Sequence, residues 1–312
     1  MKDGLLKQAL MPLILTRRRV RYYSERLQHL GRQIGDHEYG NCVISDAVRS
    51  GTPQAIGKIG FTELDCLRMS IAVRGNSNAL SITAVLRKQL YNNAGVFPDD
   101  YQSFSRWGQL LEDVLPEMTV MGVYCNSGEA SIIKRYCANA QRVRASSVDA
   151  LYYGASAWTS ALAGRKVLVA LPFERTVRQQ YARREHLYPS KPWILPEFRL
   201  DTLKVFPHAH LVKPVHRDWF EALEAMQREM DKRDFDVLLI GAGAYSIPLA
   251  VHAKRLGKQG IHVGGGAQFL FGIKGRRWDA SSGLGYYNEY WSRPLPEETP
   301  PGIERIEGGC YW

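Results

Sequence analysis

Apolar residues along this chain occur in short continuous runs that alternate with segments of helical periodicity. The clearest example lies between residues 237 and 266. Residues 237–240 have a buried-strand pattern, residues 241–243 form a Gly-Ala-Gly turn, and residues 246–256 have a helical pattern that stops at a glycine. A second strand pattern at 260–263 runs into three consecutive glycines at 264–266. This order predicts one β-α-β unit with a glycine-rich turn at the carboxyl end of each strand.

The same alternation recurs over most of the chain. Strand patterns are predicted at residues 55–60, 119–124, 166–171 and 203–206, a mostly extended segment at 143–153, and helices at 63–73, 101–115, 176–186 and 219–232. Strands that alternate with helices build a mostly parallel sheet with helices on both faces. We therefore predict the α/β class, with one Rossmann-like domain over residues 51–312 and a helical N-terminal extension over residues 1–50.

Composition and charge narrow the classes of partner. The formal net charge of +10 favours a nucleotide, a polyanion or an anionic membrane surface. No nucleic-acid recognition motif accompanies the charge, so no specific nucleic-acid partner is predicted. Five cysteines at wide spacings, without a CxxC pair, argue against a thiolate zinc site and favour reduced thiols in the cytoplasm. No apolar run reaches the length of about 18 residues that a transmembrane helix needs.

The sequence from residue 17 to residue 32 predicts a basic amphipathic helix. Val20, Tyr23, Leu27 and Leu30 fall on one face of that helix. Two interpretations stay open. The helix packs on the domain edge or on a sister subunit of a homo-oligomer, or it lies on the inner face of a membrane and makes the protein a peripheral membrane protein.

The glycine turns lie where open parallel sheets bind ligands. Backbone amides at the helix start, followed later by a basic run, indicate a site for an anion such as a diphosphate. The turn is neither the dinucleotide fingerprint, because Ser246 replaces the third glycine, nor a P-loop. The alternative is that the glycines only permit tight turns and close packing. The candidate donor-binding residues of this region are Gly241, Gly243, Tyr245, Ser246, Gly265, Gly266, Lys274, Arg276 and Arg277.

Several strings of this chain resemble bacterial GT-D-type glycosyltransferases. They are Gly-Ala-Gly-Ala-Tyr-Ser-Ile-Pro-Leu-Ala from Gly241, Gly-Gly-Gly-Ala-Gln-Phe-Leu-Phe-Gly-Ile-Lys-Gly-Arg-Arg-Trp from Gly264, the Leu-Pro-Phe-Glu loop at 171–174, and the closing Glu-Gly-Gly-Cys-Tyr-Trp at 307–312. The similarity covers residues 50–312 and is strongest after Lys166. The resemblance implies a Rossmann-like fold, a nucleotide-sugar donor, best known as UDP-glucose, and a function in bacterial glycan or surface-polysaccharide assembly.

The family also carries an Asp-x-Glu motif, after a strand that ends in glycine, that binds a divalent metal. Here Gly60-Phe61-Thr62-Glu63 stands in that place, so Glu63 matches the motif but Phe61 replaces the aspartate. One carboxylate makes a weak Mn²⁺ or Mg²⁺ site, although magnesium is also held through one or two carboxylates plus substrate phosphates. Lys58 or the basic run that contains Arg277 is an alternative source of charge for the diphosphate leaving group.

The residues and the resemblance together predict a hexosyltransferase that uses UDP-hexose and a glycan or glycolipid acceptor. Glu63 and Glu174 are the candidate catalytic carboxylates, because each follows the end of a predicted strand and one carboxylate must take the acceptor's proton. Gly60 and Lys58 are added to the donor-binding candidates. The alternative, suggested by Phe61, is a catalytically inactive nucleotide- or glycan-binding protein of the same fold.

Overall fold

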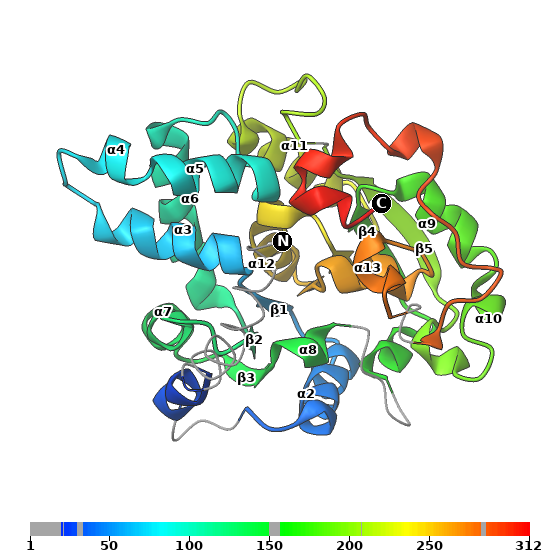
Figure 1. The fold of residues 1–312 in the computed structure, drawn as a ribbon. Helices are drawn as coiled ribbons and strands as arrows, with labels where there is room; N and C mark the ends of the chain where they lie inside the picture. Colours follow the sequence, from blue (N-terminus) through cyan, green and yellow to red (C-terminus); the bar gives the residue numbers. More distant parts are fainter. Residues whose placement is uncertain (1–19, 21, 30–33, 150–156, 207, 282–284) are drawn as a thin grey trace, which may run out of the picture.

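The computed structural model describes residues 20, 22–29, 34–149, 157–206, 208–281 and 285–312. Over these residues the chain forms one seven-stranded sheet in the order β3-β2-β1-β7-β6-β4-β5, and each pair of neighbouring strands is parallel (Figure 1). The strands are β1 (Gln54–Lys58), β2 (Val120–Val123), β3 (Gln141–Arg144), β4 (Lys166–Leu171), β5 (Arg199–Lys204), β6 (Val237–Ile240) and β7 (Gln259–His262). The predicted α/β fold with a parallel sheet is confirmed.

Helices connect the strands and follow them to the carboxyl terminus. They are α2 (His37–Arg49), α3 (Phe61–Ala72), α4 (Ala79–Ile82), α5 (Ala84–Gln89), α6 (Tyr101–Val114), α7 (Glu129–Tyr136), α8 (Ala145–Val148), α9 (Glu174–Tyr181), α10 (Arg184–Leu187), α11 (Trp219–Asp231), α12 (Ser246–Arg255), α13 (Gly265–Leu270) and α14 (Arg276–Asp279). Asp36, Asp100 and Asp218 begin α2, α6 and α11, and each carboxylate accepts a hydrogen bond from a backbone N–H of the first turn. The segment 143–153, predicted as extended, instead turns into α8 directly after β3.

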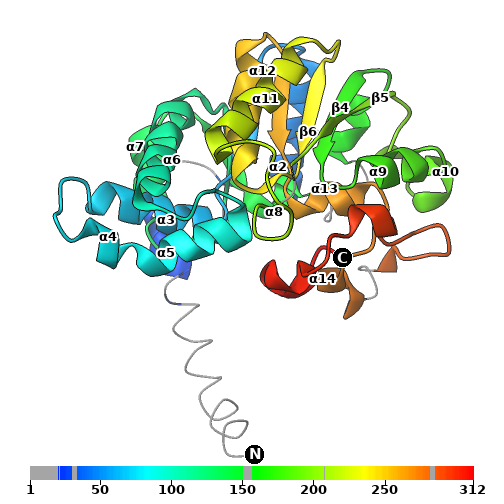
Figure 2. The ribbon, with the colours of Figure 1, turned by 90° about the horizontal axis from the view of Figure 1, so that it is seen from above.

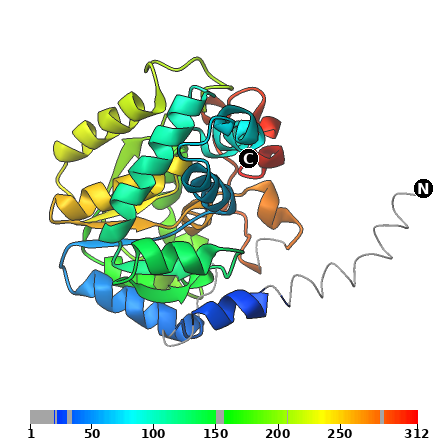
Figure 3. The same cartoon turned by 90° about the vertical axis from the view of Figure 1, so that its left-hand side faces the viewer.

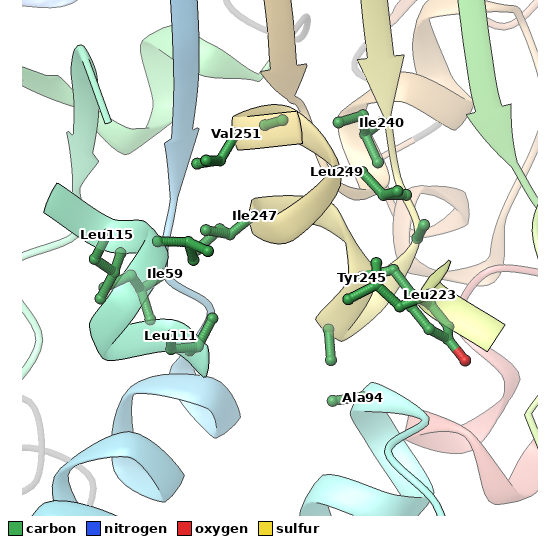
Figure 4. Close-up of a cluster of buried hydrophobic side chains, with 14 of the residues drawn as sticks. Ile59, Ala94, Leu111, Leu115, Leu223, Ile240, Tyr245, Ile247, Leu249 and Val251 are labelled. Carbon is green, nitrogen blue, oxygen red and sulfur yellow. The ribbon is translucent and has the colours of Figure 1, made fainter. Parts of the chain in front are cut away.

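Alternate residues of the central strands enter two separate hydrophobic clusters, which shows that both faces of the sheet are covered. In β6, Leu238 and Ile240 belong to the first cluster with residues of α3, α6, α11 and α12. Val237 and Leu239 belong to the second cluster with residues of α2, α8, α9 and α13. Figure 4 shows members of the first cluster from α6, α11, α12 and β6. The near-continuous apolar pattern of 237–240 therefore reflects burial on two sides.

The N-terminal region contributes two different pieces. Helix α2 lies within the predicted extension, yet its Ile44 and Val48 are fully buried in the second cluster, so α2 covers the sheet. Before it, residues 22–28 are helical and lie at the edge of the molecule near α7 (Figure 3). The rest of the predicted extension, 1–19, 21 and 30–33, lies outside the described residues. Among the described helices, none is long and apolar enough to cross a membrane.

The order of the strands places a topological switch point between β4 and β6. The chain leaves β4 toward the outer strand β5, whereas it leaves the neighbouring β6 toward β7, on the other side. Adjacent strands whose connections diverge leave a crevice at their carboxyl ends, and this topological switch point is where open α/β sheets bind ligands. The C-terminal segment, coloured orange to red, lies on the same side of the sheet as α3, α4 and α5 (Figure 2).

Candidate functional site

A cavity of about 1210 Å³ lies at the carboxyl edge of the sheet. Its floor is formed by the last residues of several strands and by the residues that follow them, namely Lys58, Gly60 to Glu63, Tyr124, Leu171 to Arg175, Lys204 to Phe206, Gly241 to Gly243, His262 and Gly264 to Gly266. Asp149, which follows α8, also lines the cavity. Its walls come from the turn at 93–95, from the loop after β5 and from the C-terminal segment that ends at Trp312. Ligand pockets usually measure about 300–1,000 Å³, so this one has room for more than a single small ligand.

The structure brings most of the predicted site residues together in this cavity. Its lining includes Lys58, Gly60, Glu63, Glu174, Gly241, Gly243, Tyr245, Gly265, Gly266 and Arg277. Three predicted residues, Ser246, Lys274 and Arg276, are not part of the lining. The Ser246 hydroxyl accepts a hydrogen bond of 3.0 Å from the backbone N–H of Ala242 and so holds the turn. The Lys274 ammonium lies over the ring of Tyr287, and a guanidinium nitrogen of Arg276 lies 3.5 Å from the carbonyl of Gly308.

Two glycines of the turn after β6 are required by close approach of other backbone. A Cβ atom on Gly241 would lie 2.6 Å from the carbonyl oxygen of Gly264, in the turn after β7. Gly243 has a φ of +53° and would place its Cβ 2.9 Å from the carbonyl oxygen of Ala94. Glycine alone tolerates both conditions without strain. These two glycines therefore permit tight turns and close packing, which was the alternative interpretation of the sequence. They also form part of the cavity floor.

Tyr245 combines packing with exposure to the cavity in the same way. Its ring stacks on Trp219 at 4.7 Å between ring centroids and 9° between planes, and only 4% of the residue is exposed. Only a small part of Tyr245 is exposed to the cavity, so this residue contributes to the shape of the cavity wall and offers little surface for contact with a ligand.

Gly265 makes room for the guanidinium group of Arg277. A Cβ atom on Gly265 would lie 2.5 Å from Nη1 of Arg277. The guanidinium group therefore rests above the backbone at the start of α13. It is held there by the C-terminal segment, through Glu307 Oε2 at 3.3 Å, Cys310 Sγ at 3.2 Å and the face of the Tyr311 ring, whose centroid is 4.3 Å away. One cation of the predicted basic run thus reaches the cavity.

A second cation, Lys58, is buried at the end of β1 and forms an ion pair with Asp149. Burial lowers the pKa of the Lys58 ammonium, although Asp149 opposes that shift. Burial likewise raises the pKa of Asp149, against the effect of Lys58. In a buried pair of this kind both the ammonium and the carboxylate lose their hydration, and this loss destabilises the folded state. In return, the Asp149 carboxylate holds the Lys58 ammonium at the cavity wall.

His262, the last residue of β7, lies in the same part of the cavity. Its Nδ1 atom is buried without a hydrogen-bond partner in the described structure. Burial, and secondarily the charge of Lys58, lower the pKa of His262 to about 3, so the imidazole is neutral at physiological pH. A neutral ring with an unpaired nitrogen can donate or accept a hydrogen bond, depending on the tautomer.

Glu63 lies in the first turn of α3, with its carboxylate folded back toward the N-terminus of the helix. A Cβ atom on Gly60 would lie 2.3 Å from Oε2 of Glu63, so the absence of a side chain at Gly60 leaves room for the carboxylate. Burial is the main cause that raises the pKa of Glu63, and the charge of Glu307 adds to it. A raised pKa brings a carboxylate closer to the range in which it accepts a proton effectively at neutral pH.

Glu174 also lines the cavity, but its carboxylate has partners. Oε1 accepts a hydrogen bond from the Thr202 hydroxyl of β5 and lies 4.0 Å from the guanidinium group of Arg178. Glu63 is therefore the stronger of the two candidate bases, because within the described part of the chain no hydroxyl or guanidinium group pairs with its carboxylate.

The described residues do not fit a metal site held by the protein alone. They contain no group of three or more His, Cys, Asp or Glu side chains able to hold a metal ion. Phe61, at the position where the resemblance expects aspartate, is 67% exposed at the cavity wall, and Asp149 is already paired with Lys58. The donor set for Mn²⁺ or Mg²⁺ is thus reduced to Glu63 and whatever oxygens a ligand would bring.

Sequence reasoning missed Asp149, His262 and the role of the C-terminal segment. Asp149 follows α8, a helix that was not predicted. His262 is the last residue of a predicted strand, and because successive side chains of a strand point to opposite faces of the sheet, the sequence does not show which face His262 is on. Only the glycines after β7 marked that strand end as part of a site. No protein-family model, no curated protein and no solved structure matches this chain.

Proposed function

We propose that this protein is a glycosyltransferase that moves a hexose from a nucleotide-diphospho-sugar, a UDP-hexose, to a hydroxyl of a glycan or glycolipid acceptor, in bacterial surface-polysaccharide or glycoprotein assembly. The observation that carries the proposal is the meeting of Lys58 and Arg277 with the glycine turns after β6 and β7 in one large cavity. The choice of UDP and of a hexose rests on the resemblance of the sequence to GT-D-type enzymes.

The first requirement of the reaction is stabilisation of the leaving diphosphate. When the bond between the anomeric carbon and the diphosphate oxygen breaks, negative charge grows on that oxygen. Lys58 and Arg277 flank the turn at 264–266, so a diphosphate there would contact both cations and the backbone of the turn. Cations held in an enclosed site stabilise such charge more strongly than cations in bulk water do. The source of positive charge in this proposal is the protein, and no step depends on a metal.

The second requirement is a base for the acceptor hydroxyl. Glu63 lines the same cavity, and its pKa is raised by burial. The carboxylate would take the proton as the hydroxyl oxygen attacks the anomeric carbon. Trp312 also lines the cavity, and an aromatic ring in that place suits contact with a sugar ring.

A catalytically inactive nucleotide- or glycan-binding protein is the second candidate. Phe61 favours it, because the motif that the resemblance implies would carry a carboxylate there. This candidate predicts that a UDP-sugar or a glycan binds but that no UDP is released when acceptors are present.

The test is a screen of nucleotides and nucleotide sugars for thermal stabilisation, followed by measurement of UDP release with crude bacterial glycans and glycolipids as acceptors. Ligand binding to the folded state raises Tm in proportion to RT ln(1 + [L]/Kd). Stabilisation by UDP and UDP-sugars together with acceptor-dependent UDP release supports the transferase. Stabilisation without UDP release supports the inactive protein. If no nucleotide or nucleotide sugar binds at millimolar concentration, the transferase is wrong, and so is an inactive protein that binds nucleotides.

A further inference from the structure

Two segments that are distant in the sequence meet at one wall of the cavity. A π-helical turn, η1 (Leu90–Ala94), supplies Asn93, the loop after β5 supplies His208, and both residues line the cavity. His208 Nδ1 lies 3.2 Å from the carbonyl oxygen of Asn92, and a Cβ atom on Gly95 would lie 3.5 Å from the His208 ring. Single π-helical turns are frequent at functional sites. We refer to this surface as the Asn93–His208 wall.

The tautomer of the His208 ring follows from its hydrogen-bond partner. A carbonyl oxygen only accepts hydrogen bonds, so Nδ1 carries the proton and donates to Asn92. Burial, and secondarily the charge of His210, lower the pKa of His208 to about 4, so the ring is neutral at physiological pH. In a neutral imidazole with the proton on Nδ1, the other nitrogen, Nε2, can only accept. His208 therefore gives the cavity wall an acceptor whose role is fixed.

The side chain of Asn93 adds an amide that has no partner. It forms no hydrogen bond with the residues that the structure describes, and Asn93 is half-buried. An amide group offers two N–H donors and one acceptor oxygen. Leu211 and Val212 also line the cavity, and their backbone N–H groups donate to the carbonyl of His208 at 2.9 and 3.1 Å. The wall thus combines a fixed acceptor, an amide and apolar side chains.

The Asn93–His208 wall is close to the turn where the diphosphate is proposed to bind. A Cβ atom on Gly241 would lie 2.6 Å from the carbonyl oxygen of Gly264, and one on Gly243 would lie 2.9 Å from that of Ala94. Gly241 and Gly243 are two residues apart, which is at most about 7 Å of chain. The cavity floor therefore runs from the turn after β7, across the turn after β6, to the wall. A nucleoside attached to a diphosphate at the first turn can follow this floor.

We infer that the Asn93–His208 wall binds the nucleobase of the donor and selects uracil over cytosine. Uracil carries a proton on N3 between two carbonyl groups, whereas N3 of cytosine has no proton and only accepts. Nε2 of His208 accepts a hydrogen bond from N3–H of uracil, but it would face the lone pair of cytosine N3. The amide of Asn93 donates to an adjacent uracil carbonyl. This inference rests on the proposed function, since it assumes that a nucleoside diphosphate occupies the cavity.

The experiment is isothermal titration calorimetry of the full chain with UDP, CDP and inorganic pyrophosphate. The wild type should bind UDP at least about tenfold more tightly than CDP, because a site that hydrogen-bonds one group rejects an analogue that leaves it unpaired. His208→Asn keeps an N–H for the carbonyl of Asn92 but has no atom in place of Nε2. Its affinity for UDP should fall about tenfold, and its Kd values for UDP and CDP should become similar.

The neighbouring asparagines supply a matched pair of variants. Asn93→Ala should raise the Kd for UDP about three- to tenfold, because one neutral hydrogen bond to the base is lost. Asn92→Ala is the control, since Asn92 lines only a smaller hollow beside the cavity and its carbonyl stays in place. Affinity for pyrophosphate should be the same in the wild type and in all three variants, and Tm shows whether each is folded.

The outcomes separate this inference from the proposed function. Equal affinity of the wild type for UDP and CDP, or an unchanged ratio in His208→Asn, overturns the selection of uracil. Equal UDP affinity of Asn93→Ala and Asn92→Ala, or UDP that binds no more tightly than pyrophosphate, overturns the place of the base but leaves the diphosphate site intact. If His208→Asn does not fold, the asparagine pair still decides. If the wild type binds none of the three probes at millimolar concentration, the proposed function fails and the inference fails with it.

Discussion

Adjacent arginines on α14 give the sharpest test of the cavity as a diphosphate site. Arg277 lines the cavity above Gly265, whereas Arg276 is turned toward the carbonyl of Gly308 outside the lining. Replacing Arg277 with alanine should weaken UDP binding, and replacing Arg276 with alanine should leave it nearly unchanged. The two variants remove the same charge from neighbouring positions, so a general effect of net charge would reduce both affinities equally.

The expected magnitude follows from the present partners of Arg277. A hydrogen bond to a charged group contributes roughly 1.5–3 kcal/mol, equivalent to about ten- to a hundred-fold in Kd. Arg277 already lies 3.3 Å from the carboxylate of Glu307, and a diphosphate would compete with that partner. The net free energy that Arg277 contributes to UDP binding is therefore at the lower end of this range. We expect Arg277→Ala to raise the Kd for UDP roughly tenfold. Arg277→Lys should fall between, because lysine keeps the charge but not the planar fork.

Isothermal titration calorimetry with UDP measures these differences, and Tm checks that each variant is folded. Arg277 also stacks on the Tyr311 ring, so a small loss of Tm is expected for Arg277→Ala alone. The placement of the diphosphate is refuted if Arg277→Ala binds UDP as tightly as the wild type, or if Arg276→Ala loses as much affinity as Arg277→Ala.

Four further substitutions test the floor and the carboxylate of the cavity. Gly265→Ala places a methyl group 2.5 Å from the present position of Nη1 of Arg277, so the guanidinium group must move. UDP affinity should then fall about as much as in Arg277→Ala while Tm changes little, and an unaltered Kd would contradict this. Gly241→Ala presses on backbone of the neighbouring turn and should lower the free energy of unfolding by roughly 2 kcal/mol in denaturant titration, whereas a neutral result would show that the turn yields. Glu63→Gln should abolish most UDP release but keep UDP affinity and Tm, and an active variant would leave Glu63 as a helix-start charge only. Burial lowers the pKa of His262 to about 3, so the folded state resists protonation of this ring and is destabilised as the pH falls from the unfolded pKa near 6.5 toward 3, by up to about 1.4 kcal/mol per pH unit. Above about pH 6.5 this destabilisation is absent. The free energy of unfolding of His262→Asn should therefore fall less steeply in acid than that of the wild type, and parallel curves for the two proteins would contradict this.

The parts of the fold that the sequence predicts are those with a local cause. Residues 237–240 are apolar on both sides because β6 is covered on both faces, and this continuous pattern is recognisable without knowledge of its partners. The glycine turns after β6 and β7 were also predictable, because in the sequence the glycines directly follow a buried-strand pattern. The segment 143–153 lacked such a signal, and the short helix α8 within it was not predicted.

The choice between Arg276 and Arg277 could not be made from the sequence. Neighbouring residues on a helix point about 100° apart, and only the position of the whole helix decides which one faces the cavity. That position depends on contacts with the C-terminal segment, such as the one between Arg277 and Glu307. Asp149 is a similar case, because its partner Lys58 is 91 residues away and no local spacing connects them.

Both cations of the cavity have carboxylate partners that a diphosphate would have to replace. Lys58 is paired with Asp149, and Arg277 is paired with Glu307, so neither cation is free in the structure described here. A diphosphate must therefore exchange with carboxylates, and its affinity is the difference between two sets of ion pairs. The charge of Glu307 also raises the pKa of Glu63. A ligand that draws Arg277 away from Glu307 leaves the negative charge of Glu307 less neutralised. The pKa of Glu63 then rises further, because the charge of Glu307 acts on it more strongly. Donor binding and the proton affinity of the proposed base would then be coupled through Arg277, in the direction that strengthens the base once the donor is in place.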